Sequence, residues 1–561
     1  MEVTRRDLLK LLVIGGGLGA QTPRALAQAL TPERLLEFEP LGNVTLLHIT
    51  DTHATLLPVY HREPDTNLEV GADRGKPPYV TGEEFLRAYA LSRGTAEAYA
   101  LTHLDFPALA ARYGKMGGYA HLATLVKQIR AARPGKTLLL DGGDALQGSA
   151  TALWSRGEDM LRATNQLGVE VFTAHWEFIY GIDRVKELFG DKDGGGRFTG
   201  EFLAHNVTDA TWGDPVFKPY TIREIGGVKV GVIGQAFPYV PVSHPRRFVP
   251  DLTFGIREER IQGLVNELRD GKKVDLVVLL SHNGLYVDLK LVRRVRGLDV
   301  VLGGHTHDAV PRVIEVGKTL LVHSGSHGKF LSRLDLDVRG GRIAAYRFKL
   351  IPVLSRFIPE DPEMAGLIRQ VRAPHAPKLS ENLAVSESLL YRRNTFSGTF
   401  DELILDALLK RFDAQVAFSP GFRWGITLIP GQPITREDVY AHTSLTYPNT
   451  WVRDLTGEEI KFIMEDVADN LFHRDPYYRQ GVDMVRVGGI TSAIAPEKEM
   501  GKRIVSIQVG GKPLDPNKKY KVTGWASIGE ADGPPVWELL ESYLKDVKKV
   551  KLDPRPRVKV L

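Results

Sequence analysis

Residues 44–53 read Val-Thr-Leu-Leu-His-Ile-Thr-Asp-Thr-His, a mostly apolar run that ends directly in an Asp-x-His pair. A short, nearly continuous apolar run bounded by polar residues is typical of a strand buried on both faces of a sheet. Asp51 and His53 then lie where the strand ends and a loop begins. Loops converge at the carboxyl ends of such strands while the strands stay rigid, so we expect this pair to carry function.

The same pattern recurs along the chain. Further apolar runs lie at 137–140, 169–173, 228–233, 274–280, 299–302 and 319–322. Longer segments with helical spacing separate them, which predicts a layered α/β domain over residues 43–352. Residues 58–115 are polar and bear Pro and Gly, and they predict an insertion that serves either as a docking surface or as plain surface elaboration.

The chain has 561 residues, too many for one ordinary hydrophobic core, so a second domain is expected. We predict a helix from 360 to 379 within a bridging segment, 357–382. A smaller α/β domain follows over 385–558, with helices at 400–412 and 457–470 and strands at 503–509 and 519–523.

Composition excludes several classes of site. The chain contains no cysteine, which rules out disulfides, metal–thiolate sites and a cysteine nucleophile. Any metal ligands must therefore be His, Asp, Glu, Asn or Gln. Lys and Arg number 73 against 68 Asp and Glu, and this small imbalance gives no argument for nucleic acid.

Residues 1–29 resemble an export signal. They hold Thr4-Arg5-Arg6-Asp7-Leu8-Leu9-Lys10, a twin-arginine pattern, followed by an apolar stretch at 11–20 that is too short to span a bilayer. Ala27-Gln28-Ala29 offers a cleavage site. We predict a twin-arginine signal peptide and a periplasmic protein, the alternative being an N-terminal helix packed on the body. No membrane span is expected elsewhere.

Four more strand ends carry residues that bind hard metals. Each follows an apolar run: Asp141-Gly142-Gly143-Asp144, His175, Ser281-His282-Asn283-Gly284 and Gly303-Gly304-His305-Thr306-His307-Asp308. A lone strand-end His is more often structural, and a lone Asp-Gly-Gly-Asp is usually a turn. Together, and in this order, the five pieces predict a two-metal site. Imidazole and oxygen ligands without sulfur suit Mn²⁺, Fe or Zn²⁺.

This order of motifs resembles the calcineurin-like metallophosphoesterases, and the two-domain layout resembles the 5'-nucleotidase family. In the second domain, Ser419-Pro420-Gly421-Phe422-Arg423-Trp424-Gly425 stands where that family carries an anion-binding loop. The segments 434–440 and 447–449 follow with the family's spacing. The resemblance covers 43–558 and implies a four-layer αββα sandwich plus a smaller α/β C-terminal domain of 5'-nucleotidase type, which binds substrate.

The resemblance also implies a ligand set. One metal would be held by Asp51, His53 and His307, and the other by His175, His282 and His305, with Asp144 bridging the two. It implies two divalent ions, with Mn²⁺ expected first, and a water between them that acts as the nucleophile.

One departure from the family bears on the leaving group. The family reads Gly-Asn-His-Glu where this chain reads Ala174-His175-Trp176-Glu177. His175 can replace Asn as a ligand, but Trp176 cannot supply the proton that the family His gives to a departing oxygen. A thiol titrates near ~8.5 and leaves readily as its anion, so the site suits a sulfur leaving group.

A second departure concerns the nucleobase. Nucleotidases sandwich the base between aromatic rings, one of which follows a Gly-Gly-Asp-Gly loop. The corresponding stretch here, 529–535, ends in Pro534-Pro535 and has proline at the expected ring position, although Trp537 is near in sequence. A nucleobase platform is therefore not expected.

With the segments 234–239, 422–425 and 483–489, these departures resemble the SoxB family, the thiosulfohydrolases of the sulfur-oxidation (Sox) pathway. The resemblance implies hydrolysis of the terminal sulfonate from a cysteine S-thiosulfonate on the SoxYZ carrier protein, with release of sulfate. The cysteine belongs to the carrier, so the absence of cysteine here is no obstacle.

Roles follow for the second domain and the channel. Arg423 would pair with the sulfonate, the alternative being a surface or interdomain salt bridge. Arg392 and Arg393 are weaker candidates for the same role. Asn449 would contact the substrate. Trp176 would either wall a channel for the carrier arm or pack as core.

Two rival functions stay open at this point. The chain could be a periplasmic 5'-nucleotidase or cyclic phosphodiesterase, or a binding module that has lost catalysis. We expect a monomer that binds neither nucleic acid nor membrane.

Overall fold

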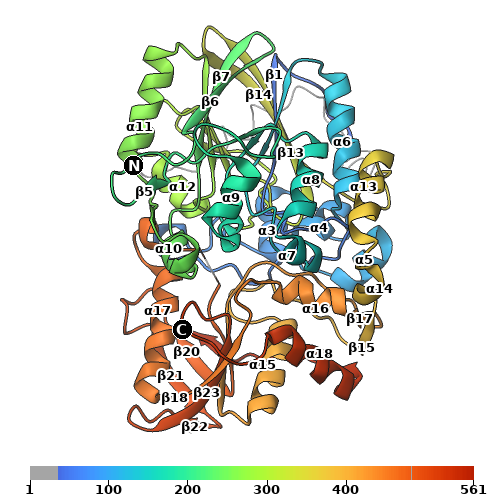
Figure 1. The fold of residues 1–561 in the computed structure, drawn as a ribbon, viewed down its shortest axis with the longest axis vertical. Helices are drawn as coiled ribbons and strands as arrows, with labels where there is room; N and C mark the ends of the chain where they lie inside the picture. Colours follow the sequence, from blue (N-terminus) through green and yellow to red (C-terminus); the bar gives the residue numbers. More distant parts are fainter. Residues whose placement is uncertain (1–35, 482) are drawn as a thin grey trace.

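The computed structural model describes residues 36–561 except residue 482, and Figure 1 shows two stacked domains. The N-terminal domain, from blue to yellow, lies above the orange and red C-terminal domain. The signal peptide predicted at 1–29 lies outside the described residues. Within the described part of the chain, the search for a helix long and apolar enough to cross a membrane found none.

Two six-stranded sheets form the N-terminal domain, and each is largely parallel. The first has the order β14-β13-β1-β2-β3-β4, with β1 Val44–Ile49, β2 Thr137–Asp141, β3 Val171–Phe172, β4 Glu201–Phe202, β13 Phe330–Arg339 and β14 Arg342–Pro352. The second has the order β11-β12-β10-β9-β7-β6, with β6 Tyr220–Ile225, β7 Val228–Gln235, β9 Leu276–Ser281, β10 Val300–Gly303, β11 Ile314–Val316 and β12 Thr319–His323. Every apolar run predicted as a strand overlaps one of these strands.

The sheets are stacked face to face between helices. Leu46 and Leu140 of the first sheet pack against Val232 and Leu280 of the second in one buried cluster. Alternate residues point outward, because successive side chains of a strand face opposite ways. They meet helices α6 (Tyr119–Ala132) and α8 (Glu158–Leu167) on one side, and α11 (Glu258–Asn266) and α12 (Leu285–Leu291) on the other. This confirms the expected four-layer αββα sandwich.

The insertion contributes three short helices, and the segment before them crosses the domain boundary. The helices are α3 (Gly82–Tyr89), α4 (Ala96–Leu101) and α5 (Phe106–Tyr113). The backbone N–H of Thr427 donates to the carbonyl of Tyr60 (2.7 Å), and Thr395 Oγ1 donates to the carbonyl of Thr66 (2.9 Å). Residues 60–66 therefore contact the C-terminal domain directly.

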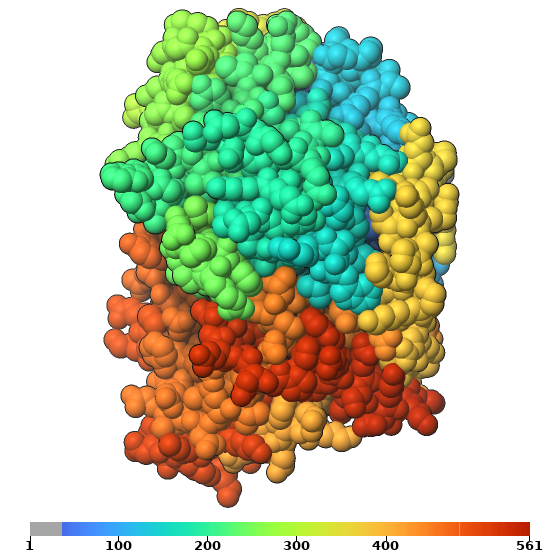
Figure 2. Space-filling model, viewed as in Figure 1, coloured from blue at the N-terminus to red at the C-terminus, as the bar shows by residue number. Residues whose placement is uncertain are grey.

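The bridging segment differs from the prediction of one continuous helix. It forms α13 (Pro362–Arg372) and α14 (Ala376–Leu379), and it runs as a yellow band along one side of both domains in Figure 2. Pro374 lies between the two helices. Proline has no N–H to donate to the carbonyl four residues earlier, so the helical hydrogen-bond pattern is interrupted there.

The C-terminal domain is a smaller α/β unit, as expected. Its sheets have the orders β18-β23-β16-β19, β22-β21-β20-β25 and β17-β15-β24. The strands are β15 Asn382–Ser386, β16 Val416–Ser419, β17 Pro433–Thr435, β18 Thr450–Thr456, β19 Arg486–Gly488, β20 Ile490–Ile494, β21 Ile504–Val509, β22 Lys512–Pro513, β23 Lys519–Trp525, β24 Lys549–Val550 and β25 Val558–Val560. The main helices are α15 (Thr399–Phe412), α16 (Arg436–Thr443), α17 (Gly457–Phe472) and α18 (Val536–Val547).

A buried ion network lies in this domain next to the segment 419–425. The guanidinium of Arg486 is fully buried and donates to Asp401 Oδ2 (3.1 Å), to Asp483 Oδ2 (3.2 Å) and to the carbonyl of Thr395 (2.9 Å). Arg392 Nε donates to the other oxygen of Asp401 (2.9 Å). Buried charges are tolerated when they are paired in this way, so the network fixes α15 against β19 and the loop before it.

Candidate metal centre

The carboxyl ends of β1, β2, β3, β9 and β10 meet at one edge of the N-terminal domain. This edge brings together all seven predicted metal ligands, and every one of them is buried. They form two groups, within each of which one ligand atom per residue lies within 4.8 Å of all the others. The groups are Asp144, His175, His282 and His305, and Asp51, His53, Asp144 and His307.

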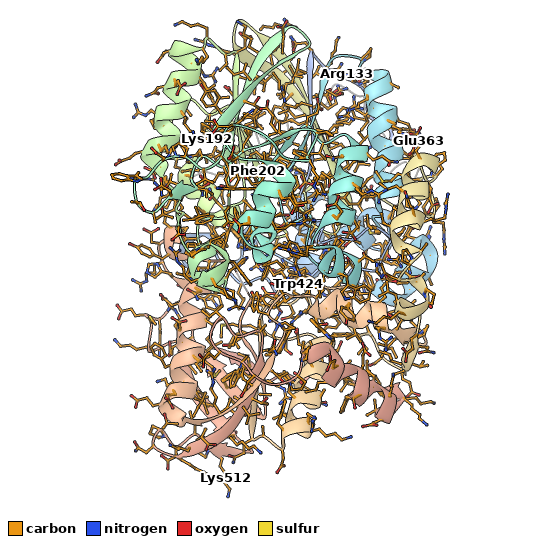
Figure 3. The ribbon with its side chains drawn as sticks, viewed as in Figure 1. Arg133, Lys192, Phe202, Glu363, Trp424 and Lys512 are labelled. Atoms are coloured by element: carbon orange, nitrogen blue, oxygen red, sulfur yellow. The ribbon has the colours of Figure 1, made fainter. Side chains whose placement is uncertain are left out.

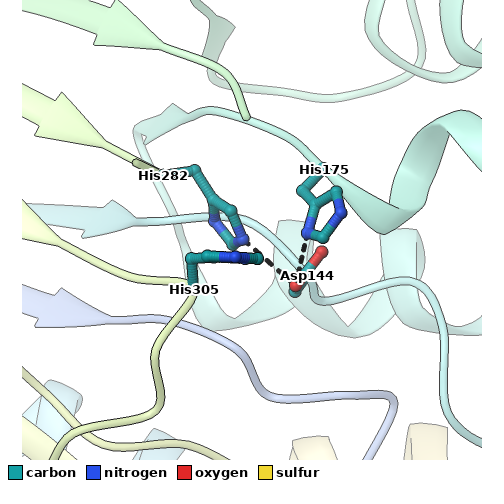
Figure 4. A group of neighbouring side chains, drawn as sticks. All are labelled: Asp144, His175, His282 and His305. Atoms are coloured by element: carbon teal, nitrogen blue, oxygen red, sulfur yellow. Dashed lines mark hydrogen bonds and ion pairs between the residues drawn. The ribbon is translucent and has the colours of Figure 1, made fainter. Parts of the chain in front are cut away.

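The first group surrounds the carboxylate of Asp144, as Figure 4 shows. Asp144 Oδ2 lies 3.1 Å from His175 Nδ1 and 3.1 Å from His282 Nε2. Its other oxygen, Oδ1, accepts a hydrogen bond from the backbone N–H of Trp176 (2.6 Å). The carboxylate is thus held in one orientation among the rings.

The second group adjoins the first through the same carboxylate. His53 Nε2 lies 3.0 Å from His307 Nε2 and 3.9 Å from Asp144 Oδ2. His307 Nε2 lies 3.3 Å from Asp51 Oδ1, and Thr50 Oγ1 donates to Asp51 Oδ2 (2.6 Å). Asp144 belongs to both groups, which is the position predicted for the bridging ligand.

The loops that carry these ligands are strained. Five of the seven have left-handed backbone: Asp51 (φ 51°), His53 (44°), Asp144 (60°), His305 (76°) and His307 (60°). Such residues cost about 1–3 kcal/mol each, and they cluster where geometry serves function. The strain indicates that the fold holds these side chains in place at the expense of local stability.

Two glycines allow the loops to approach one another. A Cβ at Gly142 would lie 2.5 Å from Thr50 Oγ1, and one at Gly304 would lie 2.3 Å from the same atom. Both distances are well inside van der Waals contact, so larger residues would push Thr50 and its partner Asp51 out of position.

Three of the rings are oriented by an oxygen on the side away from the cluster. Because a carbonyl oxygen accepts only from a ring N–H, the other nitrogen of each ring, when the ring is neutral, carries its lone pair toward the cluster. The pairs are His53 Nδ1 with Gln147 Oε1 (3.1 Å), His282 Nδ1 with the carbonyl of Gly142 (2.6 Å), and His305 Nε2 with the carbonyl of Gln480 (2.7 Å). Gln480 comes from the C-terminal domain, which therefore helps to orient a ring in the other domain.

Burial and charge set the protonation of the cluster. Burial lowers the pKa of His175 to about 4 and raises the pKa of Asp51 to about 7. Burial also disfavours the charged form of His282. The attraction of its positive charge to the carboxylates of Asp144 and Asp51 is larger and raises the pKa of His282 to about 10. In the absence of cations, the proton on His282 thus balances the carboxylates, a role that a metal ion takes over when bound.

The donor set fits two divalent cations. It contains nitrogen and oxygen without sulfur, which suits Mn²⁺, Fe or Zn²⁺. Among the described residues, two buried ring nitrogens of the cluster, His175 Nε2 and His307 Nδ1, have no hydrogen-bond partner. They are the nitrogens on the far side of each ring, so the nitrogens that face the cluster and could bind a cation are His175 Nδ1 and His307 Nε2.

Removing divalent ions with a chelator is expected to lower the melting temperature by at least about 5 °C, because each site contributes about 2.7 kcal/mol when free ion exceeds its Kd a hundredfold. Calorimetry before and after readdition of Mn²⁺ measures the shift, and elemental analysis should give two ions per chain. An unchanged melting temperature with fewer than two ions would argue against the site.

A narrow cavity opens onto the cluster between the two domains, and we call it the front cavity. Its volume is about 60 Å³. Four ligands and four aromatic residues line it: Asp144, His175, His305 and His307, and Trp176, Phe237, Phe422 and Trp424. Figure 3 labels Trp424 at the boundary between the domains.

Trp176 and Arg423 both line this cavity. The Trp176 ring packs against His244 (4.6 Å between centroids) and meets Phe422 edge-on (5.3 Å). Arg423 Nε donates to Asp483 Oδ1 (3.0 Å) and its NH1 donates to the carbonyl of Thr306 (3.0 Å). Asp483 also binds the buried Arg486, so the ion network positions Arg423 at the cavity.

Asn449, a predicted substrate contact, is not brought to the front cavity. Its Nδ2 donates to the carbonyl of Gly533 (2.8 Å), and the backbone of Asn449 pairs with that of Pro535. The role of this side chain is to join two loops of the C-terminal domain. Of the weaker candidates, Arg392 is bound to Asp401, while Arg393 NH2 donates to the carbonyl of Thr306 (3.1 Å).

Sequence reasoning missed Glu177, which holds two of the ligand loops together. Its fully buried carboxylate accepts from the backbone N–H groups of Ala145 (2.8 Å), Leu146 (3.2 Å), Asp144 (3.3 Å) and His175 (2.9 Å). Its place two residues after His175 was the available signal. Gln147 and Gln480 gave no such signal, because their partners are distant in sequence.

Comparisons with known proteins agree with this architecture. A family model for calcineurin-like phosphoesterases matches residues 44–309, and a model for the 5'-nucleotidase C-terminal domain matches residues 380–536. A solved structure of the sulfate thiohydrolase SoxB from Thermus thermophilus, in complex with glycerol, is 40% identical. The superposition covers 94% of this chain and 98% of the SoxB chain, with a TM-score of 0.90. The chain belongs to the SoxB family. This places it within the two-domain 5'-nucleotidase group of calcineurin-like enzymes.

More distant relatives of this SoxB family member include one that is named a 5'-nucleotidase precursor. A 5'-nucleotidase precursor from Thermus thermophilus is 25% identical over 92% of this chain and 99% of its own, with a TM-score of 0.70. The protein UshA from Yersinia enterocolitica is 25% identical over 76% of this chain and 84% of its own. The shared fold and the His/Asp cluster make the chain a dimetal hydrolase. Fold alone does not decide the substrate.

Proposed function

We propose that the chain is a thiosulfohydrolase, which hydrolyses the terminal sulfonate from a cysteine S-thiosulfonate on the SoxYZ carrier and releases sulfate. The observation that carries the proposal is the 40% identity to a sulfate thiohydrolase over 94% of the chain. We further propose that Mn²⁺ occupies both sites, and that the protein is exported by the twin-arginine pathway and works in the periplasm as a monomer.

The proposed reaction needs no redox partner. With R–S standing for the carrier and its cysteine sulfur, the reaction is R–S–S–SO₃⁻ + H₂O → R–S–S⁻ + SO₄²⁻ + 2 H⁺. Water oxygen bonds to the sulfonate sulfur, the S–S bond breaks, and its electron pair leaves with the sulfur that stays on the carrier. Two bound divalent ions supply Lewis-acid polarisation of the oxyanion and lower the pKa of water.

The residues of the chain bind and orient the substrate. Arg423 is held by Asp483 and the carbonyl of Thr306 and reaches the front cavity, where its planar guanidinium matches an oxyanion. The rings of Trp176 and Phe422 form an apolar wall that excludes water around the S–S bond. Exclusion of water strengthens the ion pairing between Arg423 and the sulfonate.

The site lacks a proton donor for an oxygen leaving group, which favours sulfur. Trp176 stands at the position of the family's acid, and an indole N–H is not acidic at neutral pH. His244 packs beside it, but burial lowers the pKa of His244 to about 3, so the imidazole stays neutral. A leaving persulfide or thiolate does not need that proton, since it is stable as an anion.

The shape of the front cavity supports an extended peptide arm over a nucleotide. Its volume of about 60 Å³ is far below the roughly 300–1,000 Å³ of ordinary ligand pockets. Trp537, the nearest ring to the loop that holds the base in nucleotidases, stacks on Tyr440 (5.2 Å) and does not line the cavity.

A direct comparison of substrates tests the proposal. The Mn²⁺-loaded enzyme should release sulfate from S-thiosulfonated SoxYZ and turn over AMP at least ~10³-fold more slowly, because catalysis of ester hydrolysis lacks its acid. An S-thiosulfonated peptide without the carrier fold serves as a matched substrate. Phosphate release from AMP at the rate of an ordinary nucleotidase would overturn the proposal in favour of a 5'-nucleotidase.

Replacing Trp176 by His is expected to raise hydrolysis of alkyl phosphates by up to ~10²-fold, because it restores a general acid. The sulfur reaction should not improve. Trp176→Phe is the control, since it keeps an aromatic wall without an ionisable group. Rapid cleavage of alkyl phosphates by the unmodified enzyme would show that the argument about Trp176 is wrong.

A further inference from the structure

A second cavity adjoins the metal centre at His53, and we call it the rear cavity. Its volume is about 110 Å³. His53 and Ser149 of the N-terminal domain line it together with Thr427 and Ala441 of the C-terminal domain. It shares no lining residue with the front cavity.

One imidazole separates the rear cavity from the cluster. His53 lines the rear cavity, while its Nε2 lies 3.0 Å from His307 Nε2 and 3.9 Å from Asp144 Oδ2. His307 and Asp144 both line the front cavity. The two cavities therefore approach the same cluster from two sides.

The rear cavity continues to the protein surface. Leu57, Pro58, Tyr60 and Lys115 line both the rear cavity and a surface groove of about 820 Å³. Arg356 lies further along the groove. Because these four residues line both, the cavity and the groove adjoin, and together they lie between solvent and His53.

The path suits a small anion. Lys115 is exposed where cavity and groove meet, and among the described residues it forms no ion pair; its ammonium lies 5.7 Å from the centre of the Tyr60 ring. The carboxylate of Glu437 is neutralised by a two-point ion pair with Arg372 (2.6 and 2.8 Å). Asp438 is held by Thr435, whose hydroxyl donates to it at 2.7 Å. The path therefore offers an accessible cation, while both carboxylates are already engaged.

We propose that the rear cavity and groove form the route by which the inorganic oxyanion product leaves the cluster and water enters it. The need for such a route rests on the proposed function. A carrier arm that fills a front cavity of about 60 Å³ blocks that exit for sulfate until the arm withdraws. A rear route lets the product leave independently of the carrier.

Two plugging substitutions test the route, with inorganic sulfate as the probe. Ser243 is half-buried at the end of α10 (Val240–Ser243) and lines the front cavity; Ala441 is half-buried on α16 and lines the rear cavity. The association rate of sulfate is measured on Co²⁺-loaded enzyme by stopped-flow absorption. Elemental analysis that gives two ions per chain in each variant shows that the metal centre is intact. If the tryptophan ring of Ala441→Trp prevents folding, Ala441→Phe takes its place.

Ser243→Trp alone should keep the association rate within threefold of the unmodified enzyme, because the rear route stays open. Adding Ala441→Trp should lower the rate at least tenfold, whereas adding Ala441→Ser, the matched control, should not. A tenfold loss from Ser243→Trp alone, or no further loss from the second plug, would overturn the rear route.

This measurement separates the route from the proposed function, because sulfate association requires no turnover. If the enzyme releases no sulfate from the carrier, the proposed function fails while the route is still decided by the plugs. If the enzyme hydrolyses the carrier, Ala441→Trp should lower kcat severalfold with little change in KM. An unchanged kcat in a folded Ala441→Trp variant would contradict the use of the route for product release.

Discussion

Asp144→Asn is expected to reduce turnover at least ~10³-fold, because it removes the carboxylate shared by both groups of ligands. Metal ions supply several kcal/mol of charge stabilisation, and about 4 kcal/mol corresponds to that factor. Asn matches Asp in size and still offers an oxygen to the backbone N–H of Trp176, so the fold should survive. The measurements are sulfate release and metal content, which should fall below two ions per chain.

The matched control for this change is Asp413→Asn. Asp413 is exposed, ends α15 in a left-handed conformation that Asn tolerates well, and lies in the C-terminal domain. Its activity and metal content should equal those of the unmodified enzyme. Full turnover with two bound ions in the Asp144 variant would mean that the bridging assignment is wrong.

Arg486→Met is expected to lower the free energy of unfolding by about 3–5 kcal/mol, because it leaves buried carboxylates without their partner. Asp401 and Asp483 both lie within 3.2 Å of the Arg486 guanidinium, which is fully buried. Denaturant unfolding measures the loss. Since Asp483 also binds Arg423, KM for the sulfonate substrate should rise in the folded fraction.

Arg453→Met provides the comparison, since Arg453 is exposed and its guanidinium donates to the carbonyl of Glu530. Exposed substitutions of this kind usually change stability by no more than about 0.5 kcal/mol. The stability of Arg486→Lys should lie between those of Arg486→Met and Arg453→Met, because lysine keeps the charge but not the planar guanidinium that reaches several acceptors. Equal stability of Arg486→Met and Arg453→Met would contradict the importance of the network.

The strands and the metal ligands could be predicted because both depend on local pattern. A buried strand such as β1 is a continuous apolar run, and parallel strands bring the residues after them, such as Asp51 and His175, to one edge. Pro374 also lies in plain view in the sequence and marks the break in the bridging segment, although the prediction was one helix over 360–379. Local sequence therefore contained most of the information about the N-terminal domain.

The remaining errors concern contacts between distant segments. Asn449 was assigned by its spacing in the family motif, yet its amide joins Gly533 and does not reach the front cavity. Gln480 orients His305 from the other domain, and nothing near either residue predicts how the two domains dock. Contacts of this kind are set by the packing of whole domains, which single-sequence patterns do not encode.

The hydrogen bond from His305 to the carbonyl of Gln480 limits how the protein can be divided. The catalytic half is not a self-sufficient module: expressed alone, it would keep all seven ligands but lose the acceptor that sets the tautomer of one imidazole. Recombining it with a substrate half from a nucleotidase would alter metal affinity as well as specificity. A change of the C-terminal domain that moves Gln480 would therefore reach the metal ligands as well.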